Sequence, residues 1–424
     1  MSKIITASPP KQIIISHVYS SDNKGDAALT SVLIKDLKRQ FPKATLTIFT
    51  LDTTVGTFEG VPEKPSFMSY ALNKYHNPLL KLAYVLYMIC ATLAWAIWRR
   101  FVGGYLYLPD HLRQIALQYN KADLIVPVGG GYIRSRAGLM HRLNIPLLLH
   151  PLLFGYLLGK PTVLYSQSVG PFQNKFEKWL VAFVLKRMTF IFLREDTSLA
   201  LLAKLGVTHT TVRAIDSGFL HTSTSKIDMR QQYKIPKNKL LVGVTVRSWL
   251  KGAAQTNYEE AVAKALDTII ETENAYIMFI PQVTAAKGDD DRLVSQKVFS
   301  LMRHPESATV ITTTPDHHQI KAMYDNLDIL LGTRFHSVIF CLTSYVPVLA
   351  IEYEHKTSGI MRDLQLQNWV IKIEDVSAKR LTQQLQKLIR EQARYRTHLC
   401  KHLPTYVNRA KQTVKMLEQA LYEI

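Results

Sequence analysis

Residues 328–351 read DILLGTRFHSVIFCLTSYVPVLAI and indicate the architecture of the chain. They open with a short apolar run, pass through a polar loop at Gly332–Ser337, continue as an apolar segment of helical length and end in a second apolar run. A buried strand, a helix and another buried strand in this order are typical of a βαβ unit in a parallel sheet. We therefore expect parallel sheets with polar loops at the carboxyl ends of the strands.

The same alternation runs along the rest of the chain. In the first half, the expected strands are Gln12–Val18, Thr45–Phe49, Asp123–Val128, Thr162–Ser166 and Thr189–Leu193. In the second half, they are Leu240–Val246, Tyr276–Ile280, Thr309–Thr312, Ile329–Leu331 and Val348–Ile351. The polar segment Ser223–Lys239 separates the halves, so we expect one α/β domain over 1–225 and another over 226–424. From about Ala378, one or two basic amphipathic helices complete the second domain.

Composition limits the classes of partner. The chain has 424 residues, 47% of them hydrophobic, and a net charge of +19. This length suggests two or three domains at about 150 residues each, and the charge favours an anionic partner: nucleic acid, an acidic membrane surface or a phosphorylated substrate. We find no nucleic-acid-binding module and expect no such partner.

The cysteines and the N-terminus indicate the compartment. Cys90, Cys341 and Cys400 are widely spaced, without a C-x-x-C pair that would suggest a metal site or a disulfide framework. This usage fits a reducing compartment. The first twenty residues contain charge and two prolines where a secretory signal needs an apolar core, so we expect a cytoplasmic protein.

One apolar segment, LAYVLYMICATLAWAIW at 82–98, is flanked by Lys81 and by Arg99–Arg100. As a helix it would be about 25 Å long, short of the roughly 30 Å hydrocarbon core of a bilayer. Expected strands of one sheet lie on both sides of it, and a membrane crossing would separate them. We therefore expect the insertion 79–100 to attach the protein peripherally to the anionic inner leaflet, with a buried interdomain or oligomer helix as the alternative.

Polar loops follow the strands of the first domain. The loop from His17 to Asp26, which contains Asn23 and Gly25, precedes a helix expected to begin near Ala27. Free backbone N–H groups at such a position bind ligands in α/β folds. Asp26 has the alternative role of a helix N-cap.

Three further loops lie on the same rim. Gly129, Gly130 and Gly131 either let a ligand approach the main chain or form a tight turn. They are not part of a G-x-G-x-x-G pattern, so no dinucleotide cofactor is indicated. Ser168 and Arg194 end the next two apolar runs. Asp196 and Ser198, after Arg194, are read first as caps of the following helix.

The second domain carries more cations at its strand ends. Arg247 follows LLVGVTV, Gln282 follows YIMFIP, and the loop after DILL contains Arg334, His336 and Ser337. An arginine and a histidine near a helix N-terminus form a phosphate clamp. Glu352 and Lys356 follow the next strand and would orient a ligand hydroxyl and add positive charge, or lie on the surface.

The adjacent His317 and His318 are assigned to solvent or a helix cap. The reason is that neighbouring side chains diverge and that no third ligand is close in sequence. We expect no metal site.

Together these loops resemble a known family. The motifs that carry the resemblance are N-x-G-D-x-A-L at 23–29, the GGG loop, S-V-G-P-F at 168–172, R-E-D-x-S at 194–198, R-x-W at 247–249, G-T-R-x-H-S at 332–337 and E-Y-x-x-K at 352–356. In this order they resemble the polysaccharide pyruvyl transferases, from about Ile13 to about Asp375. Asp216–Ser217–Gly218 departs from the Asp-Pro of relatives, and the apolar segment at 82–98 lies outside the shared motifs.

The resemblance implies a glycosyltransferase-B-like fold, with two Rossmann-like domains facing a cleft. It also implies transfer of a pyruvyl group from phosphoenolpyruvate to a sugar of a bacterial surface polysaccharide or its lipid-linked precursor. Phosphoenolpyruvate would be a co-substrate, and no cofactor or metal is expected, because guanidinium and ammonium groups can neutralise the leaving phosphate.

The roles implied for the residues follow this chemistry. The expected donor-binding residues are Arg247, Arg334, Lys356, Gln282 and Ser337. His336 is the general acid or a phosphate partner, and Asp26 or Glu352 accepts the hydroxyl proton. The expected acceptor-side residues are Asn23, Gly25, Gly129, Gly130, Gly131, Ser168 and Arg194.

Two other functions remain open at this point. A nucleotide-sugar glycosyltransferase would use the same architecture, with Arg247, Lys356 and Glu352 binding a diphosphate and a ribose. A basic scaffold at the membrane surface in a polysaccharide assembly complex would need no catalytic residue, so replacing His336 would leave its phenotype intact.

Overall fold

The computed structural model describes residues 9–52, 56–135, 143–285 and 289–422. The chain divides into two compact units. Unit 1 contains residues 1–20, 29–217 and 409–424, and unit 2 contains residues 21–28 and 218–408. The expected boundary at 225/226 therefore differs from the observed one at 217/218, and the segments 21–28 and 409–424 belong to the units opposite to those expected.

Unit 1 contains two sheets with the orders β3-β4-β2-β1-β5 and β6-β7-β8-β9. The strands are β1 (Gln12–Val18), β2 (Thr45–Thr50), β3 (Thr57–Phe58), β4 (Val61–Pro65), β5 (Leu124–Pro127), β6 (Gly130–Ile133), β7 (Val163–Val169), β8 (Phe190–Leu193) and β9 (Thr211–Arg213). All pairings are parallel except that of β3 with β4. A parallel bridge between Ile125 and Thr162 links the two sheets.

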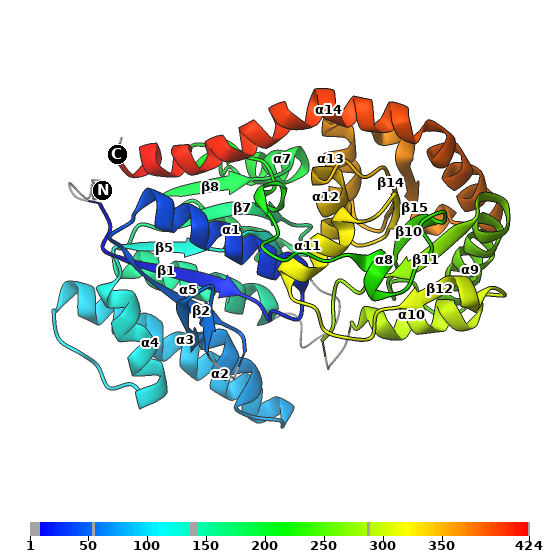
Figure 1. The fold of residues 1–424 in the computed structure, drawn as a ribbon. Coiled ribbons are helices and arrows are strands. Elements are labelled where there is room, and N and C mark those ends of the chain that lie inside the picture. The colour runs from blue at the N-terminus through cyan, green and yellow to red at the C-terminus, as the bar shows by residue number, and fades with distance from the viewer. Residues whose placement is uncertain (1–8, 53–55, 136–142, 286–288, 423–424) are drawn as a thin grey trace. The chain divides into compact units, whose positions relative to one another are not determined.

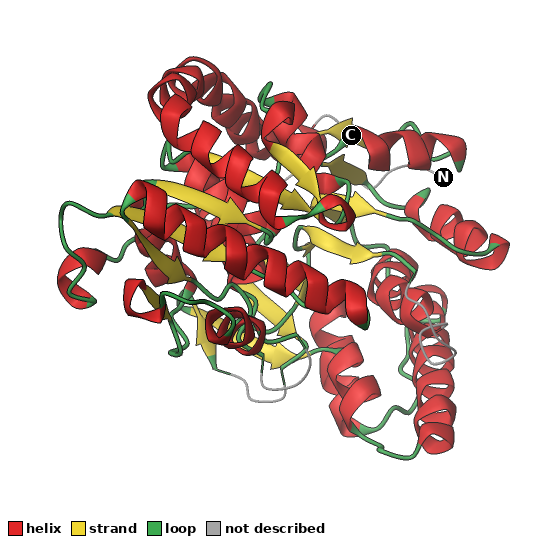
Figure 2. Ribbon diagram, turned by 90° about the vertical axis from the view of Figure 1, so that its right-hand side faces the viewer, coloured by secondary structure: helices red, strands yellow, loops and turns green. Residues whose placement is uncertain are grey.

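The helices of the first half are α1 (Lys24–Gln40), α2 (Phe67–Asn73), α3 (Pro78–Phe101), α4 (Asp110–Lys121), α5 (Asn144–Leu157), α6 (Lys175–Leu185) and α7 (Asp196–Lys204). The strands lie between layers of helices (Figure 2). A short 3-10 helix, η2 (Ser217–Leu220), follows β9.

Unit 2 contains one parallel sheet of order β12-β11-β10-β13-β14-β15. Its strands are β10 (Leu240–Thr245), β11 (Ala275–Phe279), β12 (Ala308–Val310), β13 (Ile329–Gly332), β14 (Val348–Glu352) and β15 (Val370–Lys372). The first strand lies inside the sheet, and the strand order reverses between β10 and β13. This is the order of a dinucleotide-binding doubly wound sheet, in which ligands bind outside the carboxyl ends of the strands at the reversal.

The helices of unit 2 are α8 (Met229–Gln232), α9 (Ala253–Glu273), α10 (Asp291–Ser300), α11 (His317–Asp325), α12 (Phe335–Thr343), α13 (Lys356–Asp363) and α14 (Ala378–Tyr422). Figure 1 shows α9 and α10 beside β11 and β12, and α12 and α13 beside β14. The residues from Val338 to Leu342 of α12 are all buried. The βαβ unit expected over 328–351 is confirmed, because α12 connects two largely apolar strands, β13 and β14, and packs on both.

Each expected strand is present, with ends shifted by at most a few residues. The strands β3, β4, β6, β9 and β15 were not expected. They are short, and sequences such as VPEKP of β4 contain prolines and charges that do not read as strand. The basic tail is one helix, α14, which continues through Pro404, and its Leu417 belongs to the core of unit 1.

The apolar segment forms α3, capped by Asn77, whose side chain accepts from the amides of Leu79 and Leu80. One face is buried, by Tyr84, Val85, Met88, Thr92, Trp95 and Ala96, and packs largely against α5. Among the helices of the described residues, α3 is long and apolar enough to cross a bilayer by length and composition, but 33% of its most apolar window is buried in the protein. The helix therefore has one protein-facing side and one exposed apolar side.

Candidate active site

Two arginines contact one carboxylate at the point where the strand order of unit 2 reverses, between β10 and β13. Arg247 follows β10, and its Nη2 lies 2.9 Å from Oδ2 of Asp289. Arg334 follows β13, and its Nη2 lies 2.9 Å from Oδ1 of the same Asp289. A single carboxylate thus bridges two guanidinium groups at the place where doubly wound sheets bind ligands.

Arg334 also forms hydrogen bonds with a buried acid, Asp291. Its Nε donates to both carboxylate oxygens of Asp291, at 2.9 and 3.1 Å, and its Nη2 donates to Asp291 as well. Asp291 in turn accepts from the backbone amides of Gln282 and Val283, at 2.9 and 3.0 Å. Burial would lower the pKa of Arg334, but Asp291 and Asp289 raise it above the ordinary value, so the guanidinium stays charged. Its orientation is fixed before any ligand arrives.

Aromatic rings support the other cations. The guanidinium carbon of Arg247 lies 4.7 Å from the ring centre of Trp249 and 4.4 Å from that of Tyr353. Nζ of Lys356 lies 5.7 Å from the Tyr353 ring and 5.1 Å from that of Phe335. Tyr353 therefore contacts both cations, and cation–π contacts of this kind stabilise charge with little bound water.

The segment 21–28 is bound to the loop after β11. The amide of Lys24 donates to the carbonyl of Gln282 at 3.0 Å, and the amide of Thr284 donates to the carbonyl of Asp22 at 3.0 Å. Asn23 and Val283 form an antiparallel bridge. The motif N-x-G-D therefore belongs to the same unit as the two arginines, although more than half of the chain separates them in sequence.

The beginning of α1 corrects one expectation. The helix starts at Lys24, not near Ala27, and Oδ1 of Asn23 accepts from the amides of Gly25 and Asp26, at 3.1 and 3.4 Å. Asn23 is thus the capping residue, and the N-cap role for Asp26 was wrong. Asp26 lies in the first turn, where it accepts from Nδ2 of Asn23 at 2.8 Å.

His336 lies directly against Gly25. A Cβ atom on Gly25 would lie 2.0 Å from Nδ1 of His336 and 2.5 Å from its Cγ, which no real contact allows. His336 is in the first turn of α12, two residues after Arg334. Gly25 is therefore required by the imidazole, and the two sequence motifs meet at this contact.

Gln282 adds a buried donor that has no partner among the described residues. Its side chain is 2% exposed, and its Oε1 accepts from the hydroxyl of Tyr324 at 2.7 Å. Within the described part of the chain, neither its Nε2 nor Nε of Arg247 makes a hydrogen bond. Buried donors without partners are rare and costly, and here they favour a ligand that accepts hydrogen bonds.

The hydroxyl of Ser337 forms its hydrogen bonds with other residues of the protein. Its side chain is completely buried, and its hydroxyl donates to the carbonyl of Arg334 at 2.6 Å and lies 3.0 Å from Oγ1 of Thr245. These contacts hold the first turn of α12 to the end of β10. The geometry thus gives Ser337 a supporting role instead of the expected contact with the donor substrate.

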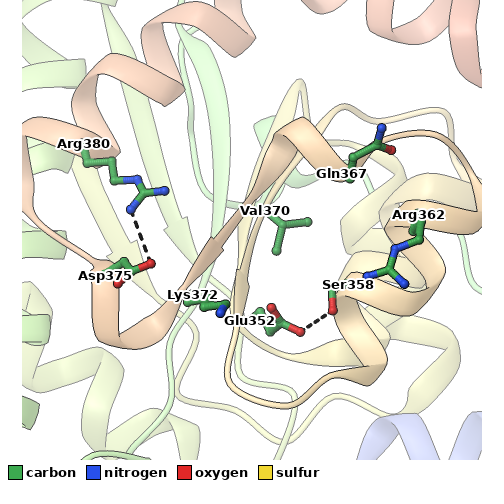
Figure 3. A pocket seen from close by; sticks show the side chains of 8 residues that line it. All are labelled: Glu352, Ser358, Arg362, Gln367, Val370, Lys372, Asp375 and Arg380. Carbon is green, nitrogen blue, oxygen red and sulfur yellow. Dashed lines mark hydrogen bonds and ion pairs between the residues drawn. The ribbon is translucent and has the colours of Figure 1, made fainter. Parts of the chain in front are cut away.

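Glu352 lines a separate hollow of about 240 Å³ (Figure 3). Its carboxylate accepts from Oγ of Ser358, and Asp375 and Arg380 form an ion pair on one side of the same hollow. The other lining residues are Arg362, Gln367, Val370 and Lys372. The lining residues do not include Arg247, Arg334 or His336, so this geometry does not support Glu352 as the acceptor of the hydroxyl proton.

The glycines at 129–131 in unit 1 allow close packing within their own sheet. A Cβ on Gly129 would lie 2.8 Å from the carbonyl oxygens of Tyr165 and Ser166 in β7. Gly130 and Gly131 continue as β6, which pairs with β7. The close approach that the glycines permit is therefore to a neighbouring strand, which favours the structural reading over the ligand-binding one.

Ser168 and Arg194 are buried and bound to one another. Nε of Arg194 donates to Oγ of Ser168, and its Nη1 donates to Oδ2 of Asp216, both at 2.6 Å. Arg194 is 3% exposed and Asp216 is 0% exposed. This buried network ties strand ends together, and the expectation that both side chains face an acceptor is not supported.

Two other assignments to helix caps were wrong. α7 begins at Asp196, with Glu195 at the N-cap, so Asp196 and Ser198 lie inside the first turn.

α11 is capped by Asp316 in a capping box with Gln319. His317 is buried, and its ring centre lies 4.3 Å from that of His318, so these adjacent side chains do not diverge.

The two doubly wound units define a glycosyltransferase-B-like fold, which solved structures confirm over the whole chain. A putative UDP-N-acetylglucosamine 2-epimerase from Listeria monocytogenes matches with a TM-score of 0.64 at 11% identity, covering 97% of both chains. The S. aureus MnaA–UDP structure matches with a TM-score of 0.60 at 14% identity, covering 98% of both chains. Anabaena HepE in complex with UDP and glucose matches with a TM-score of 0.56 at 11% identity, covering 98% of this chain and all of the other. These likenesses show the fold alone.

Sequence comparison gives the family. The amylovoran biosynthesis protein AmsJ of Erwinia amylovora is 27% identical over 273 residues, which span 61% of this chain and 63% of AmsJ. Residues 23–355 match the polysaccharide pyruvyl transferase family, and the chain belongs to this family. The match begins at Asn23 and ends at His355, so it includes both motifs that meet at Gly25 and His336.

Proposed function

We propose that the protein transfers a pyruvyl group from phosphoenolpyruvate to a sugar of a surface polysaccharide or of its lipid-linked precursor, releasing phosphate. The observation that carries this proposal is the Asp289 carboxylate between Arg247 and Arg334. It marks a position at which two guanidinium groups bind one planar anion. Phosphoenolpyruvate carries a carboxylate and a phosphate on the same carbon atom.

The two acids around Arg334 differ in how freely they can move. The Asp289 side chain is 37% exposed, whereas that of Asp291 is 2% exposed and fixed by backbone amides. A donor anion would therefore displace Asp289 and leave the Asp291 contact intact. Arg247, Arg334 and Lys356 would then neutralise the substrate, and Nε2 of Gln282 would donate to it.

The chemistry needs one proton donor and two acceptors. Protonation of the methylene carbon turns it into a methyl group while a sugar hydroxyl adds to the adjacent carbon and loses its proton. A second hydroxyl then displaces phosphate by breaking the carbon–oxygen bond, and its proton leaves with the phosphate, so that a cyclic ketal and inorganic hydrogen phosphate form. We assign the first proton to His336, fixed against Gly25, and removal of a positioned proton donor costs about 10²- to 10⁴-fold in rate. Asp26 is the assigned acceptor of a hydroxyl proton.

The exposed side of α3 supports a membrane-bound acceptor. Its exposed apolar side chains are Leu79, Leu80, Leu86, Tyr87, Ile97, Trp98 and Phe101, followed by Val102, Tyr105 and Tyr107. Arg99 and Arg100 lie in its last turn, and the net charge is +19. We assign this surface to the anionic inner leaflet of the cytoplasmic membrane, where lipid-linked sugars are presented to a cytoplasmic enzyme.

The proposal is tested by incubation of the full-length protein with phosphoenolpyruvate labelled in the pyruvyl carbons, together with lipid-linked glycans extracted from the producing bacterium. We expect label in the lipid fraction and release of phosphate only when both substrates are present. Release of a nucleoside diphosphate from sugar nucleotides, without transfer of label, would instead identify a glycosyltransferase.

A further inference from the structure

Three histidines of unit 2 gather away from the arginine cluster. His221 follows η2, and His317 and His318 begin α11. One ring nitrogen from each lies within 4.8 Å of those of the other two. Since 96 residues separate His221 from His317, this cluster exists only in the folded chain.

The three rings are packed closely against one another, and His221 also packs against Phe340. The ring centre of His221 lies 5.1 Å from that of His317, 5.2 Å from that of His318 and 5.4 Å from that of Phe340. His221 and His317 are 2% and 6% exposed, and His318 is half-buried. Three protonated imidazoles at this separation would repel one another, whereas three neutral imidazoles present lone pairs to one cation.

Hydrogen bonds orient these side chains as ligands. Nε2 of His221 lies 3.2 Å from the carbonyl oxygen of His317, and because a carbonyl only accepts, Nε2 carries the proton and Nδ1 carries the lone pair. A histidine that binds metal usually donates its second ring N–H in this way. The hydroxyl of Ser223 donates to the carbonyl of His318 at 2.7 Å and fixes the same segment to α11.

The ring of His318 accepts a long hydrogen bond from the segment after η2. The amide of Thr224 lies 3.3 Å from its Nδ1, near the upper limit of a hydrogen bond. Zinc binds imidazole nitrogens at about 2.0–2.1 Å, which places the ligands of a tetrahedral site about 3.3 Å apart. The largest separation of 4.8 Å is therefore closed by side-chain rotations that move each nitrogen by about 1 Å.

We propose that His221, His317 and His318 bind one divalent transition-metal ion, with Zn²⁺ as the best fit, and so join the segment after η2 to α11. An all-imidazole ligand set suits Zn²⁺, Cu²⁺ or Ni²⁺ and disfavours Mg²⁺ and Ca²⁺, which prefer oxygen. α11 also carries Tyr324, whose hydroxyl binds Oε1 of Gln282 at 2.7 Å. The metal thus fixes a helix that supports the candidate active site without belonging to it, and the inference does not depend on the proposed reaction.

The experiment uses the full-length protein, dialysed against a chelator and then titrated with ZnCl₂ in a calorimeter and with CoCl₂ in an absorption spectrometer. We expect one Zn²⁺ per chain and the visible bands of tetrahedral Co²⁺. His318→Gln, at a half-exposed position, and His221→Gln should each weaken Zn²⁺ binding by more than the roughly 10- to 100-fold that loss of a supporting partner costs. The thermal unfolding midpoint of the metal-free variants shows that they remain folded.

A second histidine pair provides the matched control. His398 and His402 are stacked on α14 with ring centres 4.3 Å apart, but they have no third histidine, cysteine or acidic ligand in the described residues. His402→Gln should leave both the stoichiometry and the affinity unchanged. The proposal is overturned if the wild-type protein binds no Zn²⁺, if His318→Gln and His221→Gln bind it as tightly as the wild type, or if His402→Gln abolishes binding.

Discussion

Gly25 has no Cβ atom, and the imidazole of His336 occupies the space that a Cβ would fill. A single glycine thus determines the position of a candidate catalytic side chain. Gly25 is not in a strained backbone conformation, and its requirement comes from the imidazole that occupies the space of a Cβ. The resemblance implies Gly25 as an acceptor-side residue, whereas the structure gives a separate reason for a glycine at this position. The neighbour that approaches is a side chain of the same unit.

The first prediction concerns this contact. Gly25→Ala should displace His336 and lower the rate of phosphoenolpyruvate-dependent phosphate release by about 10²- to 10⁴-fold, the range expected for a lost proton donor. Gly359→Ala is the matched control, because no atom lies within 4 Å of its added Cβ. Combining Gly25→Ala with His336→Gln should add little to the loss caused by either change alone. Wild-type activity in Gly25→Ala would contradict the account.

The second prediction concerns the bridging carboxylate. Asp289→Asn should lower KM for phosphoenolpyruvate by up to about fivefold, because a competing internal anion is removed and a partly exposed ion pair contributes at most about 1 kcal/mol. Asp290→Asn is the control, since Asp290 pairs with Arg292 and an asparagine can still cap α10. Steady-state kinetics distinguish the outcomes. An increase in KM for Asp289→Asn would mean that Asp289 supports the arginines and does not occupy their ligand position.

At the scale of elements, sequence pattern predicts strands better than it predicts where helices begin. The strands of unit 2 are apolar runs such as LLVGVT at Leu240–Thr245, which read as buried parallel strands. α1 begins three residues earlier than expected because Asn23 is its cap, while the polar residues before Ala27 read as a loop. Two-residue strands such as β3 have no periodicity to detect.

The sequence predicted those residues of the candidate site that directly follow a strand. Arg247 and Arg334 follow strands β10 and β13, and the sheet order places them together at Asp289. His336 follows Arg334 in the first turn of α12. Asp289 and Asp291 were missed because they lie in a polar stretch without a motif. The histidine cluster was missed because its third member is 96 residues away and only tertiary structure brings it close.

The third prediction concerns α3. Leu79→Gln and Leu80→Gln, at positions 76% and 56% exposed, should together weaken co-sedimentation with vesicles of phosphatidylglycerol at least tenfold, since burying a leucine contributes about 1.5–3 kcal/mol. Phe176→Gln with Trp179→Gln, 59% and 57% exposed on α6, removes similar apolar area elsewhere in unit 1 and should have no effect. Equal losses in the two double variants would indicate nonspecific adsorption and not docking through α3.

At the scale of the whole molecule, buried histidines make stability depend on pH. Burial lowers the pKa of His150 from 6.5 to about 3, with a smaller contribution from His17. Between these pH values the unfolded chain binds a proton that the folded chain does not, so the free energy of unfolding falls as pH falls below 6.5.

The fourth prediction follows from that difference. At pH 5.5 this one group should cost about 1.4 kcal/mol of stability relative to neutral pH. His150→Gln, which keeps a donor near Thr92, should remove this part of the pH dependence in denaturant unfolding measured at pH 7.5 and 5.5. An unchanged slope in the variant would show that His150 is protonated in the folded chain or that its environment opens at low pH.

The family, the fold and the cation cluster together lead to one physical claim, that two arginines at the strand reversal of unit 2 bind a donor with two acidic groups. A crystal structure of His336→Gln in complex with phosphoenolpyruvate tests it most directly, because slow turnover preserves the donor. We predict phosphoenolpyruvate between Arg247 and Arg334, with the Asp289 side chain turned away and the Arg334–Asp291 pair intact. Phosphoenolpyruvate bound elsewhere, with Asp289 still bridging both arginines, would contradict the account.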